Sequence, residues 1–379
     1  MELEKFSKFK SDNTYYNGNE LLSKTDRNGE KPEIFISTSN RSAGKTTWFG
    51  GYLLNKFLKN DELFCIVLRK KYQLEKGVSY KAYFPSALST FFPELEMKEE
   101  IGIKSVFNHI YIRLKGDDSP WFLCGYSTSI NASDDVRNFS NMFENVRRIW
   151  FDEFQPESGE YVKDEVKKLF SIHTSLARGN GSQSRYLPLI LTGNLIDLFN
   201  PYYDALNVIK DLNIEAKFYR GNGFVIEQGF NENASIAHEK STFNQAFENV
   251  GYNKVLTQKE YLNTNYNMII KVPNLKGDYL FTLKHNNVYF SVRYLNDIGI
   301  YYVSESVDKS NNLSLACTKY DMTDDCIFDG ENRFCKLMKK RYHMNNVRFS
   351  GFKAREAFLE FIRWCFTLNI KNAPHMRGY

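Results

Sequence analysis

The chain has 379 residues, a formal net charge of +5, 25% charged residues and 42% hydrophobic residues. This balance is typical of a globular protein and excludes a wholly disordered one, and the length suits two or three domains. No apolar run reaches the roughly 18 residues that a membrane-spanning helix needs, so we expect no membrane partner. The basic excess is uneven, because residues 330–379 hold 11 basic and 3 acidic side chains, whereas residues 1–208 hold 27 of each.

Residues 1–208 are predicted to form one α/β domain. Apolar runs predict strands at 33–38, 63–69, 107–114, 121–126, 148–152 and 186–192, and helical patterns lie between several of them, at 45–58, 80–92 and 162–177. Strands that alternate with helices favour a largely parallel sheet whose two faces are both covered.

The remainder of the chain has a different pattern. Residues 209–258 are polar and contain several glycines, which is typical of a linker or small connector. Residues 259–379 are predicted to form a smaller α+β domain, with a hairpin of strands at 288–294 and 299–304 and an amphipathic helix at 352–368.

The strongest motif lies between the first predicted strand and the first predicted helix. It consists of Ser39, Asn40, Arg41, Ser42, Ala43, Gly44, Lys45, Thr46 and Thr47. This is a P-loop in its required strand–loop–helix context, although Ser39 stands where the usual pattern has Gly. Backbone N–H groups of the loop and of the helix N-terminus cradle phosphate oxygens. We therefore expect Lys45 to contact the β- and γ-phosphates of ATP and the Thr46 hydroxyl to bind Mg²⁺.

Two carboxylates end the apolar strand at 148–152. Asp152 is expected to hold Mg²⁺ through water, and Glu153 to polarise the attacking water as a general base. A P-loop kinase or a simple GTPase does not need the adjacent Glu. The pair therefore favours hydrolysis of ATP.

Three further positions are candidates for charge sensing. Asn194 ends the next predicted strand, where it can sense the γ-phosphate, although a Gly-Asn turn explains it equally well. Arg178 and Arg185 flank a glycine-containing loop that can present an arginine to the ATP of a neighbouring subunit. A cation at a helix C-terminus is the alternative explanation for Arg178. Arg41, inside the P-loop, competes as a source of charge stabilisation within the same subunit.

Taken together, residues 33–205 resemble the DNA-packaging (encapsidation) ATPases of small podoviruses with terminal-protein-capped genomes. These are relatives of the large terminases among the additional-strand, catalytic-glutamate P-loop ATPases. The resemblance extends to the basic segment 67–76, to the segment 145–153 that ends in the two carboxylates, and to Gly193-Asn194 followed by 199–202, which is similar to the family's coupling motif.

The resemblance implies a homo-oligomeric ring, a pentamer, docked on the portal of an empty capsid in the host cytoplasm and absent from the mature virion. Such a ring uses ATP and Mg²⁺ to move double-stranded DNA inward, and a structural packaging RNA is a further candidate partner. The resemblance also implies that Lys71 and Arg178 act in trans at the subunit interface. Candidate contacts with DNA or with the neighbouring subunit are Arg69, Lys70, Lys104, Arg113 and Lys115.

The C-terminal domain of many family members resembles a degenerate RNase H-like nuclease, and the predicted hairpin fits the opening of such a domain. Two-metal nuclease chemistry needs several carboxylates that converge on the metals. The strand at 288–294 carries none, so we expect no nuclease activity. The basic C-terminal stretch offers instead candidate contacts with DNA, RNA or the portal, at Lys336, Lys339, Lys340 and Arg341.

Two alternatives to a packaging motor stay open on the sequence alone. One is a helicase-like ATPase that acts on single strands. The other is a nucleotide-dependent scaffold that binds RNA or the portal without motor activity.

Overall fold

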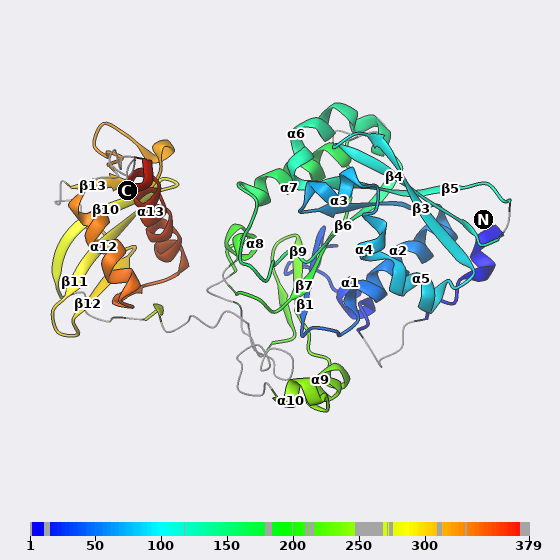
Figure 1. The fold of residues 1–379 in the computed structure, drawn as a ribbon, viewed down its shortest axis with the longest axis horizontal. Helices are drawn as coiled ribbons and strands as arrows, with labels where there is room; N and C mark the ends of the chain where they lie inside the picture. The colour runs from blue at the N-terminus through cyan, green and yellow to red at the C-terminus, as the bar shows by residue number, and fades with distance from the viewer. Residues whose placement is uncertain are drawn as a thin grey trace, which may run out of the picture. The chain divides into compact units, whose positions relative to one another are not determined.

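The computed structural model describes residues 2–10, 16–116, 118–178, 184–198, 200–208, 212, 216–246, 268–270, 272, 276–308, 313–329 and 332–371, with the backbone alone at 2, 352 and 363–371. The chain divides into two compact units, Met1–Asn263 and Thr264–Tyr379. Each unit is built around its own sheet (Figure 1).

The first unit contains a nine-stranded sheet in the order β3-β4-β5-β2-β6-β7-β1-β9-β8. Its strands are β1 (Ile34–Ser39), β2 (Leu63–Leu68), β3 (Leu95–Ile103), β4 (Phe107–Leu114), β5 (Phe122–Ser129), β6 (Val146–Asp152), β7 (Leu189–Asn194), β8 (Phe218–Arg220) and β9 (Phe224–Gln228). All pairings from β5 across to β9 are parallel, whereas β3, β4 and β8 extend the edges in antiparallel pairing. The α/β fold with a large, mostly parallel sheet is therefore confirmed.

Helices cover both faces of this sheet. Figure 1 shows α2 (Lys45–Asn60), α4 (Tyr80–Tyr83) and α5 (Pro85–Phe91) on one side, and α6 (Ser133–Val136) and α7 (Glu165–Leu176) on the other. The helix predicted at 80–92 is two helices, because Pro85 has no N–H with which to continue α4 and instead begins α5. The shorter helices of this unit are η1 (Glu2–Phe6), α1 (Asn19–Ser23), α3 (Lys71–Glu75), η2 (Ile130–Ala132), η3 (Arg137–Phe143), α8 (Pro201–Ala205), α9 (Glu232–Glu239) and α10 (Thr242–Ala246).

The core of the first unit anchors the strand that carries the two predicted carboxylates. Trp150 of β6 is fully buried, and its ring meets Tyr83 edge-on at a centroid distance of 4.8 Å. Phe49 of α2 and Phe84 pack on the same indole. Burial of a large aromatic side chain contributes roughly 2–3 kcal/mol. This packing holds β6 rigidly against α2, the helix that follows the P-loop.

The stretch 209–258, predicted as a connector, differs from that prediction in its described part. Residues 218–228 form β8 and β9, and β9 pairs with β1 along Ile34–Thr38. All five residues of β9 are buried, including the polar Glu227 and Gln228. A five-residue run with two polar members gives a weak strand signal, because burial of those polar side chains depends on partners far away in the sequence.

The second unit contains a five-stranded sheet in the order β13-β10-β11-β12-β14. Its elements are β10 (Asp278–His285), β11 (Val288–Leu295), β12 (Ile300–Ser304), β13 (Ser314–Ala316), η5 (Lys319–Asp321), α12 (Arg333–His343), β14 (Val347–Phe349) and α13 (Phe352–Lys371). The predicted hairpin is present as the antiparallel pair β11–β12. Both helices pack apolar side chains against this sheet, including Met338 and Phe358. The RNase H-like assignment of this unit stays a prediction.

Within the described part of the chain, we find no helix that combines the length and the apolar character needed to cross a membrane.

Candidate nucleotide site

The sheet brings the predicted catalytic segments to one edge. Strand β7 lies between β6 and β1, as the nucleotide motifs require. The register pairs Ser39 with Asn194 and Asp152 with Thr192. Since parallel strands end at the same edge of a sheet, the last residues of β1, β6 and β7 converge there, which is where open α/β sheets bind ligands.

The P-loop makes a tight turn between β1 and α2. Ser42 and Gly44 both have positive φ angles, of 62° and 95°. Gly44 is the residue before α2, so its left-handed conformation turns the chain into the helix and leaves the first N–H groups of α2 free of helical partners. Such a loop and helix N-terminus suit an anionic phosphate group.

Lys45 lies folded into this turn. Its Nζ donates to Ser39 Oγ at 2.6 Å and reaches Asn40 O and Asn194 Oδ1 at 3.4 Å. Burial lowers the pKa of Lys45 to about 8, although the charges of Asp152, Glu227 and Glu153 oppose the shift. A buried ammonium group held only by neutral oxygens is a strong site for an anion.

A chain of hydrogen bonds fixes Asp152. Thr46 Oγ1 donates to Asp152 Oδ2 at 2.6 Å, and Thr192 Oγ1 donates to Asp152 Oδ1 at 2.5 Å. Thr192 Oγ1 in turn accepts from Trp150 Nε1 at 2.8 Å. Hydroxyl and carboxylate oxygens are the ligands that Mg²⁺ prefers, so Thr46 and Asp152 together fit this ion.

Glu153 stands in the turn just after β6. Its φ of 53° is left-handed, and its N–H donates to Asp152 Oδ1 at 3.0 Å. The residue as a whole is exposed. The pKa of the Glu153 carboxyl is raised, first by loss of solvation and then by the charges of Asp152 and Glu157. A carboxylate with a raised pKa at this edge, next to Asp152, has the properties of a general base.

The three candidate arginines have different surroundings. Arg41 Nη1 pairs with Glu157 Oε1 at 2.7 Å, and both side chains are about half exposed. Arg185 donates from Nη2 to Phe143 O and Leu176 O, at 3.1 and 2.8 Å, and is half-buried. Arg178 follows the C-terminus of α7 and is exposed. Of these three arginines, Arg178 and Arg41 are therefore the exposed residues, and the Arg41 guanidinium is paired with Glu157. The loop at 179–183 lies outside the described residues.

The basic segment after β2 contains residues of two kinds. Lys70 and Lys71 are exposed at the start of α3. Arg69, predicted as a contact with DNA or with a neighbouring subunit, has a side chain only 13% exposed that forms an ion pair with Glu165. The Arg69 guanidinium group is therefore occupied inside the subunit, and its contact with DNA or with a neighbouring subunit stays a prediction.

The strand-end candidates lie at opposite edges of the sheet. Strand β4 runs antiparallel to β5, with Phe107 opposite Thr128 and Ile112 opposite Phe122. Lys104, which is exposed just before β4, therefore lies on the same edge of the sheet as the nucleotide site, several strands away. The residues after Ile112 are at the far edge, where Arg113 pairs with Glu96 at 2.6 Å and Lys115 donates to Pro93 O at 2.7 Å.

The basic candidates of the second unit lie on α12. Lys336 and Lys340 are exposed, whereas Lys339 and Arg341 are half-buried. The Arg341 guanidinium lies over the ring of Tyr301, 5.3 Å from its centroid.

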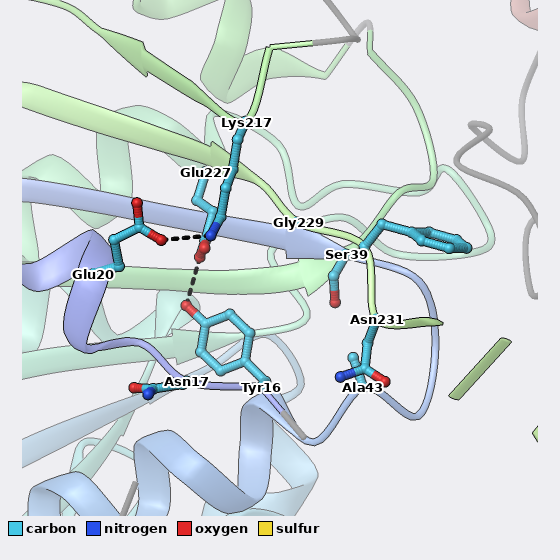
Figure 2. A pocket seen from close by; sticks show the side chains of 10 residues that line it. Tyr16, Asn17, Glu20, Ser39, Ala43, Lys217, Glu227, Gly229 and Asn231 are labelled. Carbon is cyan, nitrogen blue, oxygen red and sulfur yellow. Dashed lines mark hydrogen bonds and ion pairs between the residues drawn. The ribbon is translucent and has the colours of Figure 1, made fainter. Parts of the chain in front are cut away.

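A pocket of about 270 Å³ lies beside the P-loop, and its lining residues are Tyr16, Asn17, Glu20, Ser39, Ala43, Lys217, Glu227, Gly229, Phe230 and Asn231. Figure 2 shows Tyr16 pointing to Glu227 and Lys217 reaching to Glu20. Glu227 Oε2 accepts from Tyr16 OH at 2.7 Å and from Ser37 Oγ at 3.0 Å. Burial raises the pKa of this carboxyl.

Two hydrogen bonds donated by backbone N–H groups join the pocket to the P-loop. Tyr16 N donates to Ala43 O at 2.8 Å, and Asn231 N donates to Asn40 Oδ1 at 2.8 Å. The sequence did not reveal that Tyr16 and Glu227 line this pocket, because Tyr16 precedes the first predicted strand and Glu227 lies in the stretch predicted as a connector. The available signal for Glu227 was a Glu directly after the apolar residues 224–226.

Comparisons with known proteins agree on one family. A family model described as podovirus DNA encapsidation protein (Gp16) matches residues 10–364. The DNA packaging proteins of Bacillus phages PZA and phi29 are each 23% identical to this chain over 309 residues, which is 81% of this chain and 83% of each relative. A chain of the bacteriophage Phi-29 viral genome packaging motor assembly has the same fold, with a TM-score of 0.64, 19% identity and coverage of 93% of this chain and 99% of that chain. The Phi-28 gp11 DNA packaging motor is similar as well, with a TM-score of 0.59, 16% identity and coverage of 93% and 98%.

Proposed function

The chain belongs to the podovirus DNA encapsidation protein family, and from this premise we propose that it is the ATP-hydrolysing subunit of a motor that translocates double-stranded viral DNA into a preformed capsid. The observation that carries the proposal is the meeting of Lys45, Thr46, Asp152 and Glu153 at one edge of a parallel sheet. A P-loop alone serves many reactions, whereas a P-loop facing an Asp-Glu pair suits hydrolysis.

Each residue has a distinct task in this proposal. Lys45 and the loop N–H groups bind and orient the phosphates, and Asn194 beside Lys45 senses the terminal one. Thr46 and Asp152 would hold Mg²⁺, which neutralises developing charge on the phosphate oxygens. Glu153 takes the proton of the attacking water on its carboxylate.

The trans-acting arginine is proposed to be Arg178 rather than Arg185. Arg185 Nη2 donates to the carbonyls of Phe143, at the end of η3, and Leu176, at the end of α7, and the other two nitrogens of this guanidinium are buried. Arg178 is exposed and lies just beyond the same helix. An arginine must be free in its own subunit to stabilise charge in the next one, and Lys70 and Lys71 are exposed for the same use.

By family membership, the motor is proposed to be a ring, a pentamer, docked on the portal of the procapsid in the host cytoplasm. The exposed basic residues of α12 are proposed to contact nucleic acid backbone, either the DNA or a packaging RNA, or else the portal. Contacts to phosphates suit packaging, because a motor must be indifferent to sequence. The second unit is proposed to be RNase H-like without nuclease activity.

One assay tests the function against its alternatives. Purified full-length protein is expected to hydrolyse ATP, with stronger stimulation by duplex than by single-stranded DNA. Stronger stimulation by single strands would favour a helicase-like ATPase, and no turnover under any condition would favour a scaffold.

A variant tests the catalytic assignment in the same assay. Glu153→Gln is expected to retain ATP binding and to lose hydrolysis by on the order of 10²-fold or more. Glu160→Gln is the matched control, since Glu160 is an exposed carboxylate in the same loop. Hydrolysis that persists in Glu153→Gln would remove Glu153 from the mechanism.

A further inference from the structure

Arg69 binds the main chain of the turn that carries Glu153. Its Nη1 donates to Glu153 O at 2.7 Å, and its Nη2 donates to Phe154 O at 2.8 Å. The same guanidinium lies 5.0 Å from the ring centroid of Phe151. One side chain from the end of β2 thus touches three positions around the end of β6: the ring of Phe151 before the turn and two carbonyls within it.

Glu165 holds Arg69 from the other side. Its Oε2 accepts from Arg69 Nε at 3.0 Å and its Oε1 accepts from Arg69 Nη2 at 2.9 Å. Glu165 is the first residue of α7, its side chain is only 1% exposed, and it also accepts from Tyr202 OH at 2.7 Å and from Val162 N at 2.9 Å. A buried carboxylate with four donors is a fixed anchor rather than a surface partner.

We propose that Arg69 is a positioning residue for hydrolysis, which holds the main chain at Glu153 in the conformation that aims its carboxylate at the attacking water. The proposal rests on the proposed ATPase function. Glu153 has a left-handed φ of 53°, a conformation that costs a non-glycine residue roughly 1–2 kcal/mol and persists only when its surroundings enforce it. Arg69, acting through the two carbonyls, supplies that enforcement.

The geometry requires an arginine. One planar group binds three acceptors on two segments: the carboxylate of Glu165 at the start of α7, and the carbonyls of the consecutive residues Glu153 and Phe154. A lysine ammonium keeps the charge but cannot present the same fork of N–H groups. The change Arg69→Lys therefore removes the positioning contacts while it leaves the buried carboxylate with a cation.

The network also joins the turn to a segment after β7. Tyr202 lies in α8, and its hydroxyl reaches the same carboxylate that holds Arg69. The change Tyr202→Phe loosens the anchor by one hydrogen bond without touching Arg69 or Glu153. It is a milder test at the other end of the same chain of contacts.

The experiment measures steady-state ATP hydrolysis and equilibrium ATP binding in full-length protein. Arg69→Lys is expected to lower kcat by on the order of 10- to 100-fold, the size of a misplacement of about 1 Å, while the Kd and KM for ATP change less than about threefold. Tyr202→Phe is expected to lower kcat by a smaller factor with the same unchanged binding. Lys81→Gln, at an exposed position to which no role is assigned, is the control and should retain the wild-type kcat.

The proposal is overturned if folded Arg69→Lys hydrolyses ATP at the wild-type kcat, or if its whole loss appears in ATP binding. Should Arg69→Lys fail to fold, a wild-type kcat in folded Tyr202→Phe overturns it instead. The two levels of inference are separable: a wild-type protein without ATP turnover refutes the proposed function. Wild-type turnover that Glu153→Gln abolishes and Arg69→Lys leaves intact refutes the positioning role alone.

Discussion

Removal of the Thr192 hydroxyl tests whether the acidic end of β6 is held by buried hydrogen bonds. Thr192 is fully buried, and its Oγ1 donates to Asp152 Oδ1 at 2.5 Å while it accepts from Trp150 Nε1 at 2.8 Å. The substitution Thr192→Val keeps the shape and the β-branched character of the side chain. It therefore removes two hydrogen bonds and little else.

The expected cost follows from these two contacts. A hydrogen bond to a charged group contributes about 1.5–3 kcal/mol, and a buried donor left without an acceptor costs about 1–3 kcal/mol. Because Asp152 is only half-buried and can turn to water, we expect a total loss of about 2–4 kcal/mol in the free energy of unfolding. In a domain of this size that loss lowers the Tm by roughly 5–15 °C.

Two measurements report on the hydrogen bond between Thr192 and Asp152. Scanning calorimetry of the full chain measures the Tm of the first unit, and the Mg²⁺ dependence of ATP hydrolysis measures how well Asp152 is positioned to bind the metal. Loss of a group that orients a metal ligand typically weakens metal affinity by about 10- to 100-fold, so the Mg²⁺ concentration for half-maximal activity should rise. Thr192→Ser, which keeps the hydroxyl, is the control for both readouts.

A double-mutant cycle completes the test. In the Trp150→Phe background no indole N–H is left to be orphaned, so Thr192→Val should cost about 1 kcal/mol less there than in the wild type. The reasoning is refuted if Thr192→Val and Thr192→Ser have the same Tm, or if Mg²⁺ dependence stays at its wild-type value.

Three further outcomes are expected. Lys45 has a pKa of about 8, so it is charged below that pH and neutral above it. Because phosphate binds the charged form better, ATP affinity measured without Mg²⁺ should fall as the pH rises through 8, by up to about tenfold per pH unit. An ATP affinity that stays constant between about pH 7 and 9.5 would contradict this. Mixing Arg178→Ala with Glu153→Gln subunits should restore part of the hydrolysis that each lacks, and no recovery in mixed assemblies would count against a shared interface. Glu227→Gln should raise the KM for ATP by about tenfold at unchanged kcat if the pocket beside the P-loop receives the nucleoside; an unchanged KM would exclude that use of the pocket.

The segments that were predicted well from the sequence are those whose pattern is contiguous in the chain. The P-loop, its strand and its helix are contiguous in the chain, so glycine, lysine and the flanking apolar runs carry the whole signal. The strand that ends in Asp152 is likewise one apolar run with two carboxylates after it. Parallel strands share one edge for their carboxyl ends, and this rule is enough to predict that Lys45 and Asp152 lie close together.

Whether a basic side chain is buried in an ion pair or exposed, in contrast, depended on partners far away in the sequence. Arg69 and Lys71 look equivalent as basic residues after an apolar strand, yet one forms a buried ion pair with Glu165, 96 residues away, and the other faces solvent. Arg178 and Arg185 differ in the same way. Sequence pattern does not encode such distinctions, because they depend on which loop carbonyls the packed helices bring within reach.

The sequence by itself determined the family resemblance and the parallel α/β sheet, and it identified the four residues proposed for the nucleotide chemistry, because these follow from short contiguous patterns. The tertiary structure alone showed that β9 pairs with β1, that Glu227 lies buried beside the P-loop, and that Arg69 donates to the main chain at Glu153. Burial and strand register assign those roles, and both are properties of the assembled sheet.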